Sequence, residues 1–79
     1  MAYTSFYSEK ELSSMGFKSI GKSCCISRKA SFYGISLISI GDNVRIDDFC
    51  ILSGNITLGS NIHISAYVAM YGAEGIVME

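Results

Sequence analysis

Apolar residues recur along this chain with a period of six residues. One series starts at Ile20 and proceeds in sixes with two jumps of eight, and all its members are apolar: Ile20, Ile26, Phe32, Ile40, Ile46, Leu52, Leu58, Ile64, Met70 and Met78. Four residues after most of them stands an apolar residue that is never aromatic: Cys24, Ala30, Val44, Cys50, Ile56, Ile62 and Val68. Because pairs two apart, such as Val44 and Ile46, share one face of a strand, each unit predicts a short strand with both residues inward.

Two-residue corners separate these strands and contain residues, such as Asn43, Gly54 and Asn61, that tolerate left-handed backbone. The segments SIGKSC, SIGDNV and TLGSNI place their apolar anchors at 20, 40 and 58, so three units make one lap of 18 or 20 residues. The longer units FYGISLIS and MYGAEGIV predict bulges on one side. The strand units recur every six residues, and segments one lap apart are the most similar. Both observations favour parallel stacking of laps over a β-meander, which needs longer strands. We therefore predict an all-β parallel β-helix of about three coils over residues 20–79.

Residues 1–19 lack the repeat and predict a cap for the first coil. Ser8 and Glu11 have capping-box spacing, Tyr7 and Leu12 stand where a hydrophobic staple would, and Gly16 suits a helix end. A short helix near residues 9–15 is expected, and it would cover the open end of the solenoid. The sequence ends one residue after Met78, which opens a fourth coil, so we expect an N-terminal part of a longer protein.

Composition narrows the functional classes. The chain is 49% apolar with mean hydropathy +0.36, which excludes disorder, and it has no run near the roughly 18 apolar residues of a membrane span. Six basic and seven acidic residues without a basic segment predict no nucleic acid partner. The N-terminus has no secretory h-region, so we expect a cytoplasmic protein. Three cysteines predict free thiols, with Cys24 and Cys50 inward and inert and Cys25 outward, and their spacing suggests no metal site.

The segments IGDNVRI and LGSNIHI, at 40–46 and 58–64, resemble the hexapeptide-repeat acyltransferases, which are left-handed parallel β-helices. GSNIHI is similar to the galactoside and maltose O-acetyltransferase branch, and the preceding helix with GFKSIG looks like sugar acetyltransferases of surface-polysaccharide pathways. The resemblance implies a homotrimer that uses acetyl-CoA, with a His as general base on the sugar acceptor and backbone N–H groups holding the oxyanion. In that branch the catalytic His lies beyond the position that matches residue 79. We therefore expect no acyl transfer by this chain alone, and we expect this part of the protein to require no cofactor.

The resemblance leaves two candidate site residues. Ser60 matches a position that contributes to the acceptor site, although a corner serine is also common in such coils. His63, the only histidine, should point outward beside Arg45, and a solvated or interface histidine is the simpler interpretation. Asp47 and Asp48 are adjacent, so in a strand they would point to opposite faces and could not share a substrate, and we interpret them as solvated corner residues.

Other outward residues suggest packing or contact. Tyr33 and Tyr71 occupy equivalent bulges, where they would pack a loop or stack on a ring. Ile51 and Ala69 are outward apolar residues and mark the third side as the candidate trimer contact.

Three functions remain open: a sugar O-acetyltransferase as the main hypothesis, an amino-sugar N-acyltransferase that acts on a nucleotide-linked sugar, and a non-enzymatic assembly solenoid. A metal-dependent member of the fold would need three histidines, and the chain has one.

Overall fold

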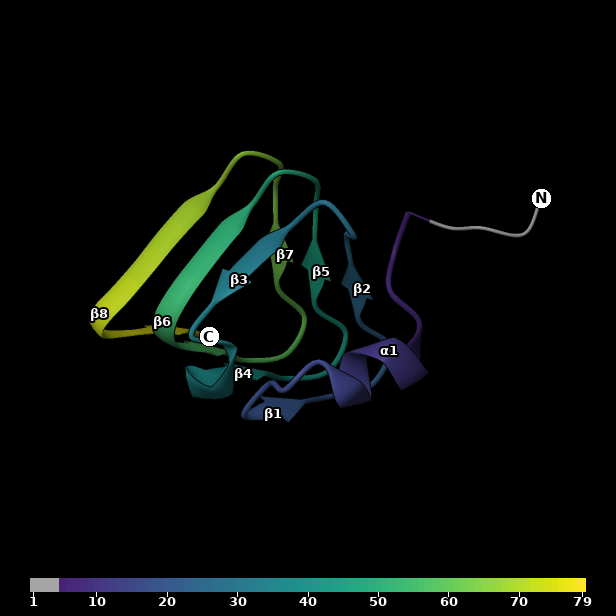
Figure 1. Cartoon of the computed structure of the whole chain (residues 1–79), viewed down its shortest axis with the longest axis horizontal. Coiled ribbons are helices and arrows are strands. Elements are labelled where there is room, and N and C mark those ends of the chain that lie inside the picture. The colour runs from purple at the N-terminus through teal and green to yellow at the C-terminus, as the bar shows by residue number, and fades with distance from the viewer. Residues whose placement is uncertain (1–4) are drawn as a thin grey trace.

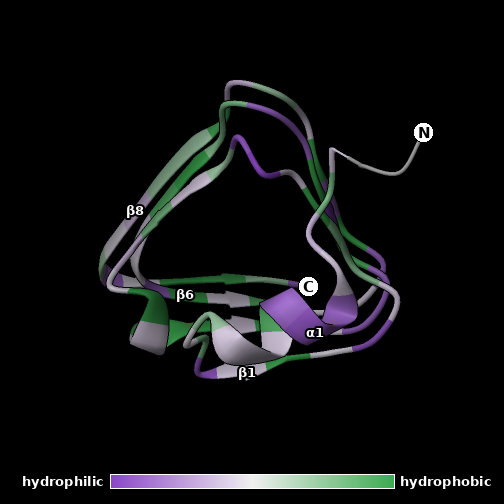
Figure 2. Ribbon diagram, turned by 45° about the vertical axis from the view of Figure 1, so that its right-hand side comes forward, coloured by the Kyte–Doolittle hydropathy of each residue, from purple (hydrophilic) through white to green (hydrophobic). Residues whose placement is uncertain are grey.

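The computed structural model describes residues 5–79 and shows a triangular solenoid with one short helix (Figures 1 and 2). Its elements follow in order: α1 Glu9–Ser14, β1 Ser19–Ile20, β2 Cys25–Ile26, β3 Ser31–Tyr33, a 3-10 turn Ile35–Leu37, β4 Ile38–Ile40, β5 Arg45–Ile46, β6 Ile51–Leu58, β7 His63–Ile64 and β8 Ala69–Met78. No helix of the described part is long and apolar enough to cross a membrane.

Each side of the triangle is a stack of parallel strands. The first side contains β1, β4 and the ends of β6 and β8; the second contains β2, β5 and β7; the third contains β3 and the starts of β6 and β8. The first corner joins the first side to the second, the second corner joins the second side to the third, and the third corner completes the lap. The predicted parallel β-helix is therefore confirmed.

The register places the six-step residues in three inward columns. On the first side Ile20, Ile40, Leu58 and Met78 are stacked partners; on the second side Ile26, Ile46 and Ile64; on the third side Phe32, Leu52 and Met70. Successive laps therefore take 20, 18 and 20 residues along the first column, as the sequence predicts.

Every predicted inward residue belongs to the core or packs against it. Those that are only half-buried lie in the first and last laps: Ile20, Cys24, Phe32, Ile62, Val68 and Met78. Cys24 is inward, as predicted, but it is only half-buried rather than buried, because its coil has a neighbouring lap on one side only. Cys50 in the middle lap is fully buried, Cys25 is exposed, and all three are free thiols.

The helix α1 forms as predicted and lies beside the open end of the first coil (Figures 1 and 2). The Glu11 backbone N–H donates to Ser8 Oγ at 3.1 Å, and Glu11 Oε1 accepts from the Ser8 backbone N–H at 2.8 Å. Leu12 is buried and Tyr7 packs against the same core, so this turn attaches to the solenoid through its apolar face.

The two longer units share the third corner but differ in conformation. Tyr33, Ser53 and Tyr71 are stacked partners, which confirms that both insertions fall on one side. In the first lap the extra residues form the 3-10 turn after left-handed Gly34, whereas in the last lap they remain within β8, with left-handed Gly75. Similar sequence positions therefore place a loop in one lap and a bulged strand in the other.

Candidate functional site

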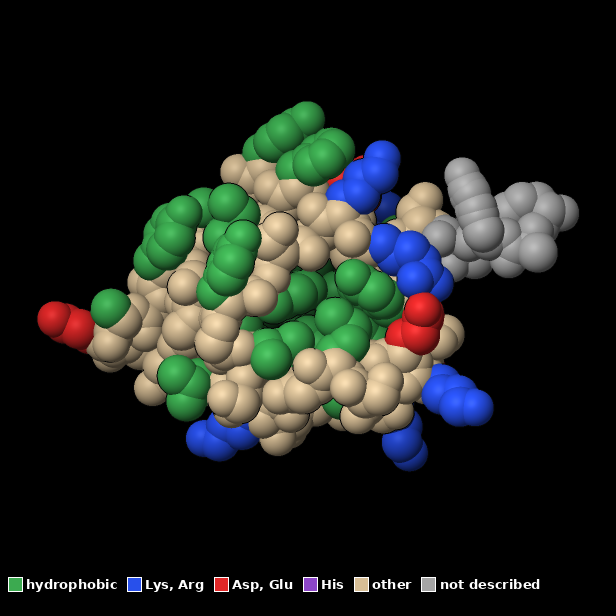
Figure 3. Space-filling view, viewed as in Figure 1, with side chains coloured by type: hydrophobic (Ala, Val, Ile, Leu, Met, Phe, Trp, Pro, Cys, Tyr) green, Lys and Arg blue, Asp and Glu red, His purple; other side chains and the backbone are tan. Residues whose placement is uncertain are grey.

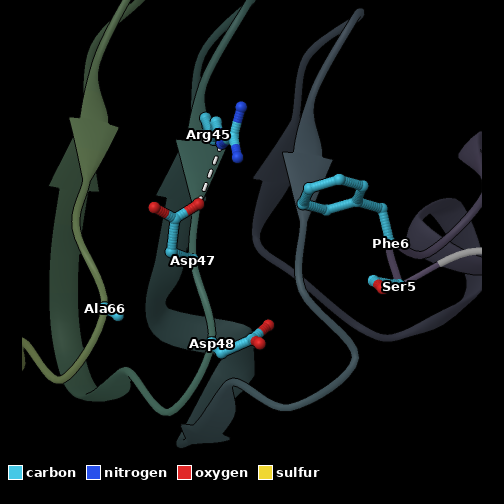
Figure 4. A pocket seen from close by; sticks show the side chains of 6 residues that line it. All are labelled: Ser5, Phe6, Arg45, Asp47, Asp48 and Ala66. Atoms are coloured by element: carbon cyan, nitrogen blue, oxygen red, sulfur yellow. Dashed lines mark hydrogen bonds and ion pairs between the residues drawn. The ribbon is translucent and has the colours of Figure 1, made fainter.

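A shallow groove of about 360 Å³ runs along the second side where it meets the second corner (Figure 4). The N-terminal segment forms one wall, and β5 with its following corner and the corner after β7 form the other. The residues that line it are Ser5, Phe6, Arg45, Asp47, Asp48 and Ala66. The groove combines one guanidinium, two carboxylates and an aromatic ring.

Arg45, Asp47 and His63 form a hydrogen-bonded cluster on the outer surface of the second side. Arg45 Nε donates to Asp47 Oδ1 at 2.8 Å, and His63 Nε2 lies 2.9 Å from Asp47 Oδ2. The parallel register of β2, β5 and β7 produces this arrangement, because Cys25, Arg45 and His63 are successive outward partners. The predicted outward position of His63 beside Arg45 is therefore confirmed, and a catalytic role for His63 stays a prediction.

Electrostatics in this cluster stabilise the ionised carboxylate. The hydrogen bond from Arg45, and then that from His63, hold the pKa of Asp47 below its usual range. Arg45 also lies with its guanidinium carbon 5.5 Å from the centroid of the Phe6 ring. Its two terminal nitrogens have no hydrogen-bond partner among residues 5–79, so they remain available to an anion such as phosphate.

Asp48 is held by a buried serine. Ser27 is fully buried, its hydroxyl donates to Asp48 Oδ1, and its oxygen accepts from the Lys29 backbone N–H at 3.0 Å. Within the described part of the chain, Asp48 has no cationic partner. A half-buried carboxylate in a fixed orientation therefore lines the groove with its charge uncompensated.

The expectation that Asp47 and Asp48 lie on opposite faces is wrong, whereas the expectation that they share no substrate stays a prediction. Both are half-buried and both line the same groove. The strand β5 ends at Ile46, so these two residues belong to a turn, where consecutive side chains need not alternate between faces. Figure 4 shows the Asp48 carboxylate directed toward the side of the groove formed by Ser5 and Phe6.

The N-terminal segment is attached to the solenoid by backbone and side-chain contacts. Phe6 bridges Ser27 in antiparallel orientation, and the Tyr7 N–H donates to the Ile26 carbonyl at 2.9 Å. Arg28 pairs with both carboxylate oxygens of Glu11 at 2.8 and 2.9 Å. These contacts build the wall of the groove opposite β5, and the sequence offers no periodic signal that would have revealed it.

Ser60 lies away from this groove, at the first corner. Its hydroxyl oxygen accepts from the Asp42 backbone N–H at 2.9 Å, and the Asp42 carboxylate in turn accepts from the Lys22 N–H at 2.8 Å. Ser60 therefore joins two laps, and the structure does not bring it together with His63 in one pocket. Its proposed acceptor-binding role stays a prediction.

The second corner carries two aromatic residues on left-handed backbone. Phe49 has φ 64° and Tyr67 has φ 67°, a conformation that costs L-residues roughly 1–2 kcal/mol each. The sequence predicted Asn and Gly at such positions, and at the other corners Asn43, Asn61 and Gly54 do adopt positive φ. Aromatic residues here were not expected, because no local pattern distinguishes them.

Two further observations concern possible ligand sites. A smaller hollow of about 180 Å³ separates α1 from β1 and is lined in part by Leu12 and Ile20. The described residues contain no group of three or more His, Cys, Asp or Glu side chains able to hold a metal ion.

Comparisons with known proteins identify relatives of this chain. No protein-family model matches it. It is 51% identical over 70 residues to the dTDP-4-amino-4,6-dideoxy-D-glucose acyltransferase of Escherichia coli, a match that covers 85% of this chain and 36% of that protein.

Solved structures agree with the sequence match. A serine variant of AntD, an N-acyltransferase from Bacillus cereus, was solved with dTDP-4-amino-4,6-dideoxyglucose and coenzyme A. It is 61% identical with a TM-score of 0.91, and the match covers 94% of this chain and 40% of that one. The AntD complex with dTDP and 3-hydroxybutyryl-CoA is 60% identical, with a TM-score of 0.91, over 95% of this chain and 40% of AntD.

These relatives are acyltransferases of amino sugars, and they do not confirm the galactoside O-acetyltransferase branch. The chain spans about two fifths of the length of each relative. It is a left-handed parallel β-helix, and it shares this fold with acyltransferases that bind coenzyme A and a nucleotide-linked sugar.

Proposed function

We propose that this chain provides the first coils of an acyl-CoA-dependent N-acyltransferase that acts on a nucleotide-linked amino sugar. The observation that carries the proposal is the 61% identity, at a TM-score of 0.91, to an N-acyltransferase solved with such a sugar and coenzyme A. This similarity favours the amino-sugar hypothesis over sugar O-acetylation. It also leaves the acyl group open, since one relative was solved with 3-hydroxybutyryl-CoA rather than acetyl-CoA.

The groove suits the acceptor better than the acyl donor. The formal charges of Arg45, Asp47 and Asp48 sum to one negative charge, which disfavours the diphosphate and 3′-phosphate of coenzyme A more than a sugar diphosphate whose amine is positively charged. Asp48 can hold the ammonium form of an amino sugar, and the free terminal nitrogens of Arg45 can bind a phosphate oxygen. The groove therefore offers complementary charges to both ends of a sugar diphosphate that carries an amine.

The reaction itself is the attack of the amine on a thioester. The bound ammonium first loses a proton to give the neutral amine. The amine nitrogen then forms a bond to the acyl carbon, the carbon–sulfur bond breaks, and the second proton passes from nitrogen to the departing thiolate of coenzyme A. In this proposal Asp48 orients the amine and Arg45 orients the diphosphate, and the group that removes the proton is not assigned to either. Ser60 and His63 keep the acceptor-binding and catalytic hypotheses of the family resemblance.

We also propose that the chain functions as a homotrimer in the cytoplasm. The outward residues of the third side support association, because Ile51 is half-buried, Ala69 is exposed, and the flanking Tyr33 and Tyr71 are 59% and 67% exposed. Three free thiols fit a reducing compartment. Light scattering should give three times the 8.6 kDa chain mass, and a monomer would contradict the proposal.

A chimera tests the activity. This chain would replace the matching 40% of AntD, and the product would be assayed with dTDP-4-amino-4,6-dideoxyglucose and 3-hydroxybutyryl-CoA. We expect N-acyl transfer, and in the Asp48→Asn chimera a raised KM for the amino sugar with an unchanged KM for the acyl-CoA. Lys10→Gln, a substitution on exposed α1, serves as the matched control. A folded chimera without transfer would refute the proposal and favour the non-enzymatic solenoid.

A further inference from the structure

The aromatic residues of the second corner are unfavourable choices for the fold itself. Phe49 and Tyr67 have left-handed φ, where a bulky side chain is strained. The other corners use small or polar residues at positive φ: Ser23, Asn43, Asn61, Gly34, Gly54 and Gly75. Corner geometry alone would therefore favour Asn or Gly at 49 and 67. Strain that the fold does not require is a recognised mark of a functional position.

The two rings form an exposed ridge. Their centroids lie 5.3 Å apart with planes inclined by 21°, and Lys29 Nζ lies 5.5 Å from the Phe49 centroid. Phe49 is 47% exposed although Lys29 and Tyr67 flank it, and Tyr67 is 77% exposed. Figure 3 shows apolar side chains projecting at the top of the molecule, beside a basic side chain. We call Phe49 and Tyr67 the aromatic ridge.

The aromatic ridge borders the groove. Asp48 directly precedes Phe49, Ala66 directly precedes Tyr67, and both preceding residues line the groove. The Tyr67 backbone N–H donates to the Asp48 carbonyl at 3.2 Å, so the two turns are joined. The aromatic ridge therefore lies directly next to two lining residues of the groove.

We propose that the aromatic ridge binds the nucleobase of the nucleoside-diphosphate acceptor, an inference that rests on the function proposed above. Aromatic edges carry partial positive charge and attract the face of another ring, and every nucleobase presents such a face. Lys29 and Arg45 supply the cations that a diphosphate between base and sugar needs. The base lies across the ridge beside Lys29, and the diphosphate and the amino sugar lie in the groove between Asp48 and Arg45.

Calorimetric titration of the 79-residue chain with thymidine diphosphate tests this placement. We expect Tyr67→Asn to weaken binding roughly three- to tenfold, the range of one aromatic contact. Its affinity for inorganic pyrophosphate should not change, since pyrophosphate has no base to place on the aromatic ridge. Leu37→Asn, an exposed apolar residue of the third corner that is 51% exposed, is the matched control and should bind as the unchanged chain does.

A second variant separates binding from folding. Tyr67→Ala should lose the same affinity as Tyr67→Asn, but it should melt about 4 °C lower, because Ala tolerates left-handed φ less well than Asn. The proposal is overturned if Tyr67→Asn binds thymidine diphosphate normally, if pyrophosphate binding falls equally, or if the unchanged chain does not bind thymidine diphosphate. A changed mass of Tyr67→Asn in light scattering would instead make the aromatic ridge a subunit contact. Transfer by the chimera combined with a neutral Tyr67→Asn would refute this inference alone.

Discussion

Replacement of Ser27 by Ala should destabilise the chain and disturb the groove together. Ser27 is fully buried between the N-terminal segment and the second corner. Its hydroxyl donates to Asp48 Oδ1 and its oxygen accepts from the Lys29 backbone N–H. The substitution removes both bonds, leaves the Lys29 N–H without its partner, and releases the Asp48 carboxylate from its fixed orientation.

The expected loss can be estimated from these contacts. A hydrogen bond to a charged group contributes about 1.5–3 kcal/mol, and an orphaned donor adds to the cost according to its burial. We expect a decrease of about 2–3 kcal/mol in the free energy of unfolding. Domains have roughly 0.05–0.15 kcal/mol of stability per residue, so a chain of 79 residues has about 4–12 kcal/mol in all. The single hydroxyl would therefore account for a large fraction of the total.

Urea unfolding followed by circular dichroism measures this loss. Ser53→Ala is the matched control, because Ser53 is half-buried in β6 and its hydroxyl has no partner among the described residues. The Asp48→Asn variant and the double variant complete a cycle in which the two losses should not add, since they remove the same contact. If Ser27→Ala unfolds within about 0.5 kcal/mol of Ser53→Ala, the assignment of Ser27 as the support of Asp48 is wrong.

Three further predictions concern the coil stack, the cap and the histidine. Gly41→Ala should lower the free energy of unfolding in urea by about 1–3 kcal/mol, because its Cβ would lie 2.8 Å from the Gly59 carbonyl. Gly59→Ala, whose Cβ would have its nearest atoms at 3.4 Å, should lower it less. Equal losses would contradict the close stacking of laps. The Arg28 side chain, and then the Ser8 backbone, lower the pKa of Glu11 from 4.5 to about 2. The stability that ionised Glu11 contributes is thus present above about pH 4.5 and is lost as the pH falls toward 2. Glu11→Gln should flatten this decline of stability with pH. Parallel profiles of stability against pH for the two proteins would count against the ion pair. His63→Ala should leave the circular dichroism spectrum unchanged and stability within about 0.5 kcal/mol, since His63 is exposed; a collapsed fold would show that its contact with Asp47 is structural.

The groove is the feature that sequence reasoning missed. Its walls come from residues 5 and 6, from the turn after β5 and from the turn after β7, which lie up to about sixty residues apart in the chain. The assumption that Asp47 and Asp48 point to opposite faces applied a strand rule to a turn. Comparisons with known proteins, rather than any motif, shifted the expected chemistry from O-acetylation to N-acylation.

The sequence by itself determined the columns of the core. Apolar residues such as Ile46 and Leu52 recur every six positions, and burying each of them is favourable. The period therefore dictates three short strands per lap, independently of which residues lie on the outer surface. Only the tertiary structure decided which outward residues meet. The left-handed turns at Phe49 and Tyr67, and the docking of Phe6 beside Ser27, depend on contacts between laps and with the N-terminal segment. Such contacts join residues distant in the chain, and a local pattern of apolar and polar positions carries no record of them.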